Sequence, residues 1–130
     1  RERVLGGQNP DTLRAKGNLA ELLRKQGRLP EAENLLKVIV DSRHASLGRD
    51  DSGTLKSRCQ LALVLAQQGD PEKLRQAEAH LREVVARREQ GLGRGHPDTL
   101  VALSRLAFLL EEKRPDEAEQ LNEQVWQWLE

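Results

Sequence analysis

The segment LGRGHPDTL, from Leu92 to Leu100, occurs in two related forms earlier in the chain. LGGQNPDTL begins at Leu5 and LGRDDSGTL at Leu47, so the three segments start 42 and then 45 residues apart. A fixed period of tens of residues is typical of stacked supersecondary units that bury their apolar faces only against their neighbours. The repetition therefore predicts a solenoid of about three similar units within the 130 residues.

Apolar residues in each unit recur at the spacing of an α-helix. In the second half of the first unit they are separated by steps of three, one, three and one residues, namely Ala32, Leu35, Leu36, Ile39 and Val40. These steps place them on one face of a helix with 3.6 residues per turn. Comparable stripes occur in the other units, and no segment alternates as a strand would. We predict an all-α, right-handed superhelical solenoid of antiparallel helix hairpins.

Capping residues and glycines mark where these helices begin and end. Asp51 and Asp70 stand where a side chain caps a helix, and Asn9 and His96 precede a proline at the first helical position, although histidine is a weaker cap than asparagine. Gly27 follows a first helix and permits a left-handed turn. Three residues are inserted between Gly69 and Ala77, which predicts that the helix starting near Pro71 is about one turn longer.

Each predicted hairpin carries one small residue in each helix, in the pairs Ala20 with Ala32, Ala62 with Ala77, and Ala107 with Ala118. With this feature, the segment NLAELLRKQGRLPEAENLL resembles the tetratricopeptide repeat. The linker LG…HPDTL is similar to that of the 42-residue variety found in kinesin light chains and in repeat arrays of signalling NTPases. The chain departs from the family pattern where leucine replaces the usual aromatic residue, at Leu23, Leu65 and Leu110.

The repeats also predict the domain organisation. We expect one repeat domain over residues 1–130, with 1–7 as the end of a preceding repeat and 8–48, 49–93 and 94–130 as three repeats. The chain begins without methionine and ends on the amphipathic run VWQWLE, which indicates a fragment of a longer protein.

Composition and motifs offer no support for several function classes. Lys plus Arg and Asp plus Glu are each 21, so no overall charge favours nucleic acid, and no apolar run is long enough to insert into a membrane. The single cysteine, Cys59, suits a reducing compartment, and we expect a cytoplasmic protein. His44, His80 and His96 lack metal-ligand spacing, and no Gly-rich loop precedes a helix. We therefore expect neither an enzyme nor a catalytic residue, metal or cofactor.

The family resemblance implies that the first helices line a concave face that binds an extended peptide. Aligned on their alanines, these helices place Asn18, Gln60 and Arg105 in one row, which the resemblance implies holds the peptide backbone. An amide side chain can both donate to and accept from a main chain. Leu63 and Phe108 form an apolar patch in a second row. The candidate peptide-binding residues are Arg14, Asn18, Lys56, Gln60, Leu63, Arg105 and Phe108.

Two functions remain open at this point. The first is a scaffold or adaptor that binds a protein or peptide with an aromatic or large aliphatic anchor and acidic flanks; in a kinesin-light-chain version it recruits cargo to a motor. The second is a structural spacer or self-association module, in which Leu63 and Phe108 only pad contacts between helices. Self-association would use the C-terminal helix, where Val125 and Trp128 share a stripe, Trp126 points away from it, and one tryptophan is expected to be exposed.

Overall fold

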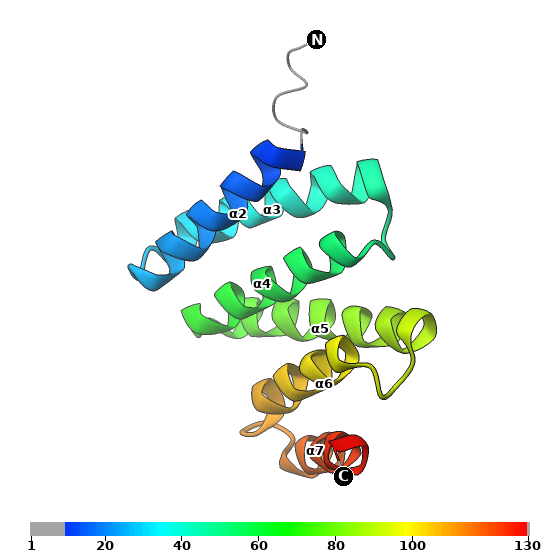
Figure 1. Ribbon diagram of the computed structural model, residues 1–130. Helices are drawn as coiled ribbons and strands as arrows, with labels where there is room; N and C mark the ends of the chain where they lie inside the picture. Colours follow the sequence, from blue (N-terminus) through cyan, green and yellow to red (C-terminus); the bar gives the residue numbers. More distant parts are fainter. Residues whose placement is uncertain (1–9, 130) are drawn as a thin grey trace.

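The computed structural model describes residues 10–129, which form six helices and no strand. The helices are α2 (Pro10–Lys25), α3 (Leu29–Leu47), α4 (Ser52–Gln68), α5 (Pro71–Leu92), α6 (Pro97–Leu110) and α7 (Pro115–Leu129). They stack in chain order as three antiparallel pairs, with the tight turns within pairs on one side and the linkers between pairs on the other (Figure 1). The predicted all-α solenoid is confirmed.

Side chains cap the starts of α4, α5 and α6 as the sequence predicts. The carboxylates of Asp51 and Asp70 each accept hydrogen bonds from two backbone N–H groups in the first turns of α4 and α5. His96 caps α6 through one hydrogen bond, which its Nδ1 accepts from the N–H of Asp98 at 3.0 Å, so it satisfies one donor fewer than either aspartate. The predicted cap at Asn9 and the predicted remnant of a preceding repeat lie outside the described residues.

Glycines end the first helices in the predicted left-handed conformation. The φ angles of Gly27 and Gly69 are 81° and 76°, a region that strains any residue with a Cβ atom. The inserted residues lengthen the helix that follows the second of these turns. Helix α5 has 22 residues whereas α3 has 19, and this difference of about one turn confirms the expectation.

The six alanines of the predicted hairpins are all buried, which lets the paired helices pack closely. Each of α3 and α5 packs against the first helix of its own pair and against the first helix of the next pair. The buried side chains consequently form one continuous core from α2 to α7. This arrangement follows from stacking, since no pair covers its own apolar stripe completely.

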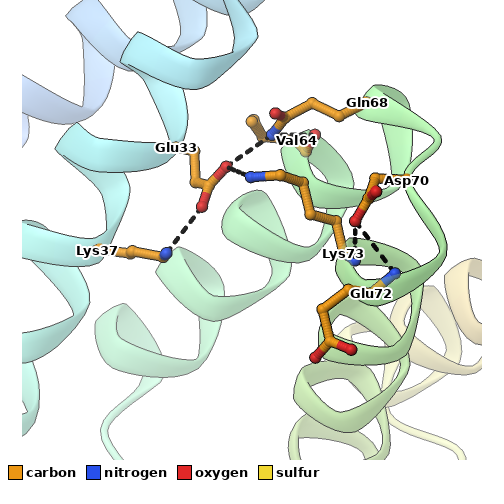
Figure 2. Close-up of polar contacts among 7 residues, drawn as sticks. All are labelled: Glu33, Lys37, Val64, Gln68, Asp70, Glu72 and Lys73. Carbon is orange, nitrogen blue, oxygen red and sulfur yellow. Dashed lines mark hydrogen bonds and ion pairs between the residues drawn. The ribbon is translucent and has the colours of Figure 1, made fainter.

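A buried carboxylate joins the first pair to the second (Figure 2). Glu33 on α3 is 4% exposed; its Oε1 accepts from Lys73 Nζ at 2.6 Å and Gln68 Nε2 at 2.8 Å, and its Oε2 pairs with Lys37 Nζ at 2.7 Å. Burial alone would raise the pKa of Glu33, but these three donors together lower it to about 2. Because Gln68 ends α4 and Lys73 lies in α5, one side chain holds three helices in register.

The same contact recurs at the next junction. Glu78 occupies the position of Glu33 in the second pair, and its Oε2 lies 2.8 Å from Arg82 Nε and 3.0 Å from Arg114 Nη1. Arg82 and Arg114 take the places of Lys37 and Lys73. The stack is therefore fixed twice by a carboxylate between two cations.

A second contact also repeats between pairs. Arg43 Nη1 donates to the carbonyl of Gly53 at 3.2 Å, and the buried Arg88 donates to the carbonyl of Asp98 at 2.9 Å. Both carbonyls belong to the first turn of the next first helix. These arginines tie the end of each second helix to the helix that covers it.

Trp126, which points away from the predicted stripe, is 65% exposed as expected, but Trp128 is also 56% exposed, so both tryptophans and not one are exposed. Trp128 lies in the predicted stripe with the half-buried Val125, but its ring rests against the linker between α5 and α6 and not under a helix. A Cβ atom added to Gly95 in that linker would collide with the ring of Trp128.

The Glu33 contact predicts a pH dependence of stability. A carboxyl whose pKa falls from 4.5 to about 2 on folding contributes about 3 kcal/mol to the unfolding free energy at pH 7. This contribution is complete above the unfolded pKa and is lost as the pH falls from about 4.5 towards 2. Urea titrations at pH 7 and pH 3 should show this loss in the parent and a smaller pH difference in Glu33→Gln, which should already be less stable at pH 7.

Glu119→Gln is the matched control, because Glu119 holds the same repeat position in the third pair and is exposed. Its unfolding free energy should stay within about 0.5 kcal/mol of the parent at both pH values. Equal effects of the two substitutions would contradict the role given to Glu33.

Candidate peptide-binding cleft

A cleft of about 620 Å³ opens between α4 and α6, above α5. It arises because α4 and α6 pack mainly against α5 rather than against each other. Its walls are the C-terminal halves of α4 and α6 and the turn before α7. Apolar side chains from all three helices line it, including Leu63, Leu74, Leu81, Phe108 and Leu109. A concave and largely apolar surface of this kind is typical of ligand-binding sites.

Three of the predicted site residues meet in this cleft. Leu63 lines the cleft from α4, and Phe108 and Arg105 line it from α6. Leu63 and Phe108 hold equivalent repeat positions, because each follows a buried alanine, Ala62 or Ala107, by one residue. Phe108 is 77% exposed, so it is not padding between helices. An exposed phenylalanine beside the half-buried Leu63 offers apolar area that a partner could remove from water.

The other four predicted site residues do not line the cleft. Arg14 and Asn18 are exposed on α2, and Arg14 forms a 3.8 Å ion pair with Asp11. Lys56 is exposed on the N-terminal half of α4, and Gln60 is half-buried near its middle. The cleft lies towards the C-terminal ends of α4 and α6, so these four side chains lie outside it.

Acidic side chains at the rim are the part of the cleft that the sequence analysis missed. Glu111, Glu112 and Lys113 line it from the turn between α6 and α7, and Glu78 lines it from α5. Lys113 and Arg114 stand where the other turns have a glycine. This difference in the sequence was the signal that could have drawn attention to the charged turn. The cleft lining thus includes three carboxylates and two cations. Lys113 lies in the acidic turn, and Arg105 lies on α6, further from that turn.

The first helices α2 and α6 also influence each other across the surface. A hydrogen bond from Arg24 is the main cause that lowers the pKa of Glu21 on α2, and the charge of Arg105 on α6 adds to it. Glu21 stands in the same row as Leu63 and Phe108.

Cys59 lies at the inner side of the cleft. Its side chain is 7% exposed and belongs to the hydrophobic core, and burial raises the pKa of its thiol. A buried neutral thiol packs as a small apolar side chain and reacts slowly.

The described part of the chain shows neither a metal-ligand cluster nor a membrane-spanning segment. Within residues 10–129, no three His, Cys, Asp or Glu side chains are placed to hold a metal ion. None of the helices in this range is both long and apolar enough to cross a bilayer.

Comparison with known proteins places the chain among helical repeats. The sequence profile of the tetratricopeptide repeat matches residues 12–52 and 54–98. A Podosopora anserina protein described as a kinesin light chain with nearly identical TPR-like repeats is 27% identical, with a TM-score of 0.82 over 95% of this chain and 57% of its own. A single-substitution variant of that protein is also 27% identical, with a TM-score of 0.85 over 97% and 58%.

BtubC (BKLC) from P. vanneervenii shares the fold, with 18% identity and a TM-score of 0.79 over 90% of this chain and 46% of its own. The chain thus spans only about half the length of these solved structures. No curated protein sequence matches it significantly.

The position of Cys59 predicts its reactivity. Iodoacetamide at pH 7.5 should alkylate the folded protein at least about tenfold more slowly than the urea-unfolded protein, because only the exposed thiolate reacts. Leu63→Ala should accelerate the reaction by opening the cleft, whereas Leu47→Ala, which truncates an exposed leucine elsewhere, should not. Equal rates in the folded and unfolded protein would show that the thiol is open to solvent.

Proposed function

Because the chain belongs to the tetratricopeptide repeat family, whose repeats generally mediate protein–protein interaction, we propose that it binds an extended peptide of a partner protein in the cleft between α4 and α6. The observation that carries this proposal is Phe108, which is 77% exposed at the mouth of an apolar cleft. We also propose that the three helix pairs correspond to repeats 8–48, 49–93 and 94–130 of a longer protein.

The peptide carries an aromatic or large aliphatic anchor that fills the space between Leu63 and Phe108. A well-buried anchor contributes about 2 kcal/mol or more, whereas exposed ion pairs contribute about 0 to 1 kcal/mol each. An acidic residue of the peptide lies beside Arg105. A basic residue suits the other end, beside Glu111 and Glu112, so acidic flanks on both sides are less favourable than the sequence alone predicts.

In this role the chain acts as a scaffold or adaptor without catalysis or a cofactor. The likeness to proteins described as kinesin light chains supports an adaptor that recruits a partner such as the cargo of a motor. We expect it to act in the cytoplasm, where Cys59 stays reduced.

Self-association is the second candidate function, and the exposed apolar residues of the outer helices favour it. Leu19 on α2 is half-exposed, although its counterpart Leu61 on α4 is buried under α3. Trp126 on α7 is exposed, although its counterpart Val85 on α5 is buried under α6. Each outer helix therefore presents a face that the inner helices cover, and another repeat or another copy of the chain would fit it.

The cleft proposal is tested by calorimetry with a peptide selected from a library. Phe108→Ala should weaken binding about 30-fold, which corresponds to about 2 kcal/mol, because it removes the apolar wall of the anchor site. Lys56→Ala should weaken it less than about fivefold, because Lys56 lies outside the cleft and an exposed ion pair contributes at most about 1 kcal/mol. Added salt should weaken binding without abolishing it.

Trp126→Ala is the matched control, since it removes an exposed aromatic side chain outside the cleft. It should leave the peptide affinity unchanged and reduce any concentration-dependent increase in mass measured by light scattering. If Trp126→Ala loses the peptide and Phe108→Ala keeps it, the cleft is not the binding site and self-association becomes the better account.

A further inference from the structure

A second cavity, of about 340 Å³, lies on a different face of α4, between α3 and α5. It shares no lining residue with the peptide-binding cleft. Charged and polar side chains dominate its lining, which consists of Val40, Asp41 and His44 from α3, Arg49 from the linker, Thr54 and Arg58 from α4, and His80 and Glu83 from α5. We call it the Arg58 pocket.

Two guanidinium groups in the Arg58 pocket are hydrogen-bonded to imidazoles. Arg58 Nε donates to His80 Nδ1 at 3.2 Å, and Arg49 Nε donates to His44 Nε2 at 3.1 Å. Over residues 10–129, neither arginine forms an ion pair with a carboxylate. An imidazole that accepts a hydrogen bond is neutral at that nitrogen, so these two contacts do not neutralise the arginine charges, which Glu83 offsets only through space.

The repeat register shows that this polar pair stands in a core position. Arg58 and Leu103 are equivalent, because both precede the helix alanine by four residues, and His80 and Leu121 are equivalent, because both follow it by three. Leu103 and Leu121 are 2% and 9% exposed. The second pair thus has a cation and an imidazole where the third pair has packed leucines, and the first pair has Lys16 and Leu35 at the same positions, both half-buried.

Such a replacement is unfavourable for folding, which indicates that the polar pair serves another purpose. A partly buried guanidinium loses hydration that a neutral imidazole restores only in part, and the burial lowers the pKa of Arg58. Natural proteins depart from good packing mainly at functional sites. The third pair shows that the fold accepts leucines at both positions, so stacking does not require the charge.

Thr54 supplies a further donor at the pocket. It is buried, and its Oγ1 has no hydrogen-bond partner. Thr99, the equivalent residue of the third pair, is also unpartnered, so this hydroxyl supports a site but does not define one. A hydroxyl can rotate to donate to a bound oxygen atom.

We propose that the Arg58 pocket binds a tetrahedral oxyanion, either free phosphate or the phosphoryl group of a phosphorylated side chain. Arg58 and Thr54 line the pocket from neighbouring turns of α4, and Arg49 lines it from the linker before that helix. A tetrahedral group can accept from several directions, whereas a planar carboxylate accepts mainly in its own plane. The pocket has the volume of roughly ten water molecules at ~30 Å³ each, which accommodates a phosphoryl group and its stem.

The carboxylates near the pocket do not prevent this binding. Glu83 is ion-paired with Arg87, which in turn lies 2.7 Å from Asp50. Asp41 is exposed at the rim, where water screens its charge. The arginine contacts of a bound anion must outweigh the repulsion from these carboxylates.

Binding should strengthen at lower pH. Burial, Arg58 and Lys37 lower the pKa of His80 in the free protein, and a bound anion would favour its protonated form. A hydrogen bond from Arg87 lowers the pKa of Glu83, and sulfate keeps its charge between pH 7.5 and 5.5, so a change in sulfate affinity over this range reports protonation of His80. The charged groups around His80 are Lys37, Asp41, Arg49, Arg58, Glu83 and Arg87.

The test uses the whole 130-residue chain with sulfate and inorganic phosphate, at constant ionic strength set with chloride. Both anions should raise the melting temperature, and sulfate should bind more tightly at pH 5.5 than at pH 7.5. The double variant Arg58→Leu with His80→Leu restores the leucine pair of the third repeat. It should be at least as stable as the parent without anion, yet bind sulfate at least tenfold more weakly.

Arg75→Leu is the control, because it removes the same charge from an exposed position on α5 that is paired with Glu72. It should keep the sulfate response. Arg82→Gln, the same type of substitution as Arg58→Gln but outside the pocket, should keep it too. Arg58→Gln provides a second variant of the pocket in case the leucine pair alters the stacking, and it should also lose the response. The proposal is overturned if sulfate and phosphate stabilise the parent no more than chloride, or if both pocket variants respond as the parent does.

Peptides with and without phosphoserine distinguish the two sources of the anion. Tighter binding of the phosphorylated peptide than of free phosphate, with no binding of its unphosphorylated form, supports a phosphorylated partner. Equal affinities for the phosphopeptide and free phosphate support a site for the free ion.

Discussion

The close packing of α4 on α5 depends on two alanines, Ala62 and Ala77, which are completely buried. Small side chains at this contact bring the two helices together but leave the other face of α5 to be covered by α6. The same arrangement in every pair turns three hairpins into one stack with a continuous core. The cleft above α5 exists because α4 and α6 both pack mainly against that helix rather than against each other.

Comparison of equivalent positions separates what holds the stack together from what distinguishes each repeat. The carboxylates of Glu33 and Glu78 both bridge two cations, and Arg43 and Arg88 both donate to the next helix. These contacts recur because each junction must be fixed in the same register. Positions that differ between repeats, such as Phe108, carry the surfaces that a partner could distinguish.

The sequence predicts the helices well because their period, caps and glycines are local signals. It also places Leu63 and Phe108 in one row of the repeat alignment, and both side chains line the cleft. The sequence does not predict contacts between segments that are far apart along the chain. Glu111 lies in a turn that no helix alignment includes, Trp128 meets a linker, and His80 looks isolated because antiparallel packing alone brings Arg58 to it across 22 positions.

The central claim, that the face between α4 and α6 binds a partner peptide, is tested most directly by an NMR titration of the ¹⁵N-labelled chain with the selected peptide. The account predicts that amide shifts change along residues 59–67 and 104–113, which contain the cleft walls, while the outer face of α2 and the end of α7 are unaffected. Shift changes confined to the surroundings of Leu19 and Trp126 would contradict it, because they would place the interaction at the ends of the stack.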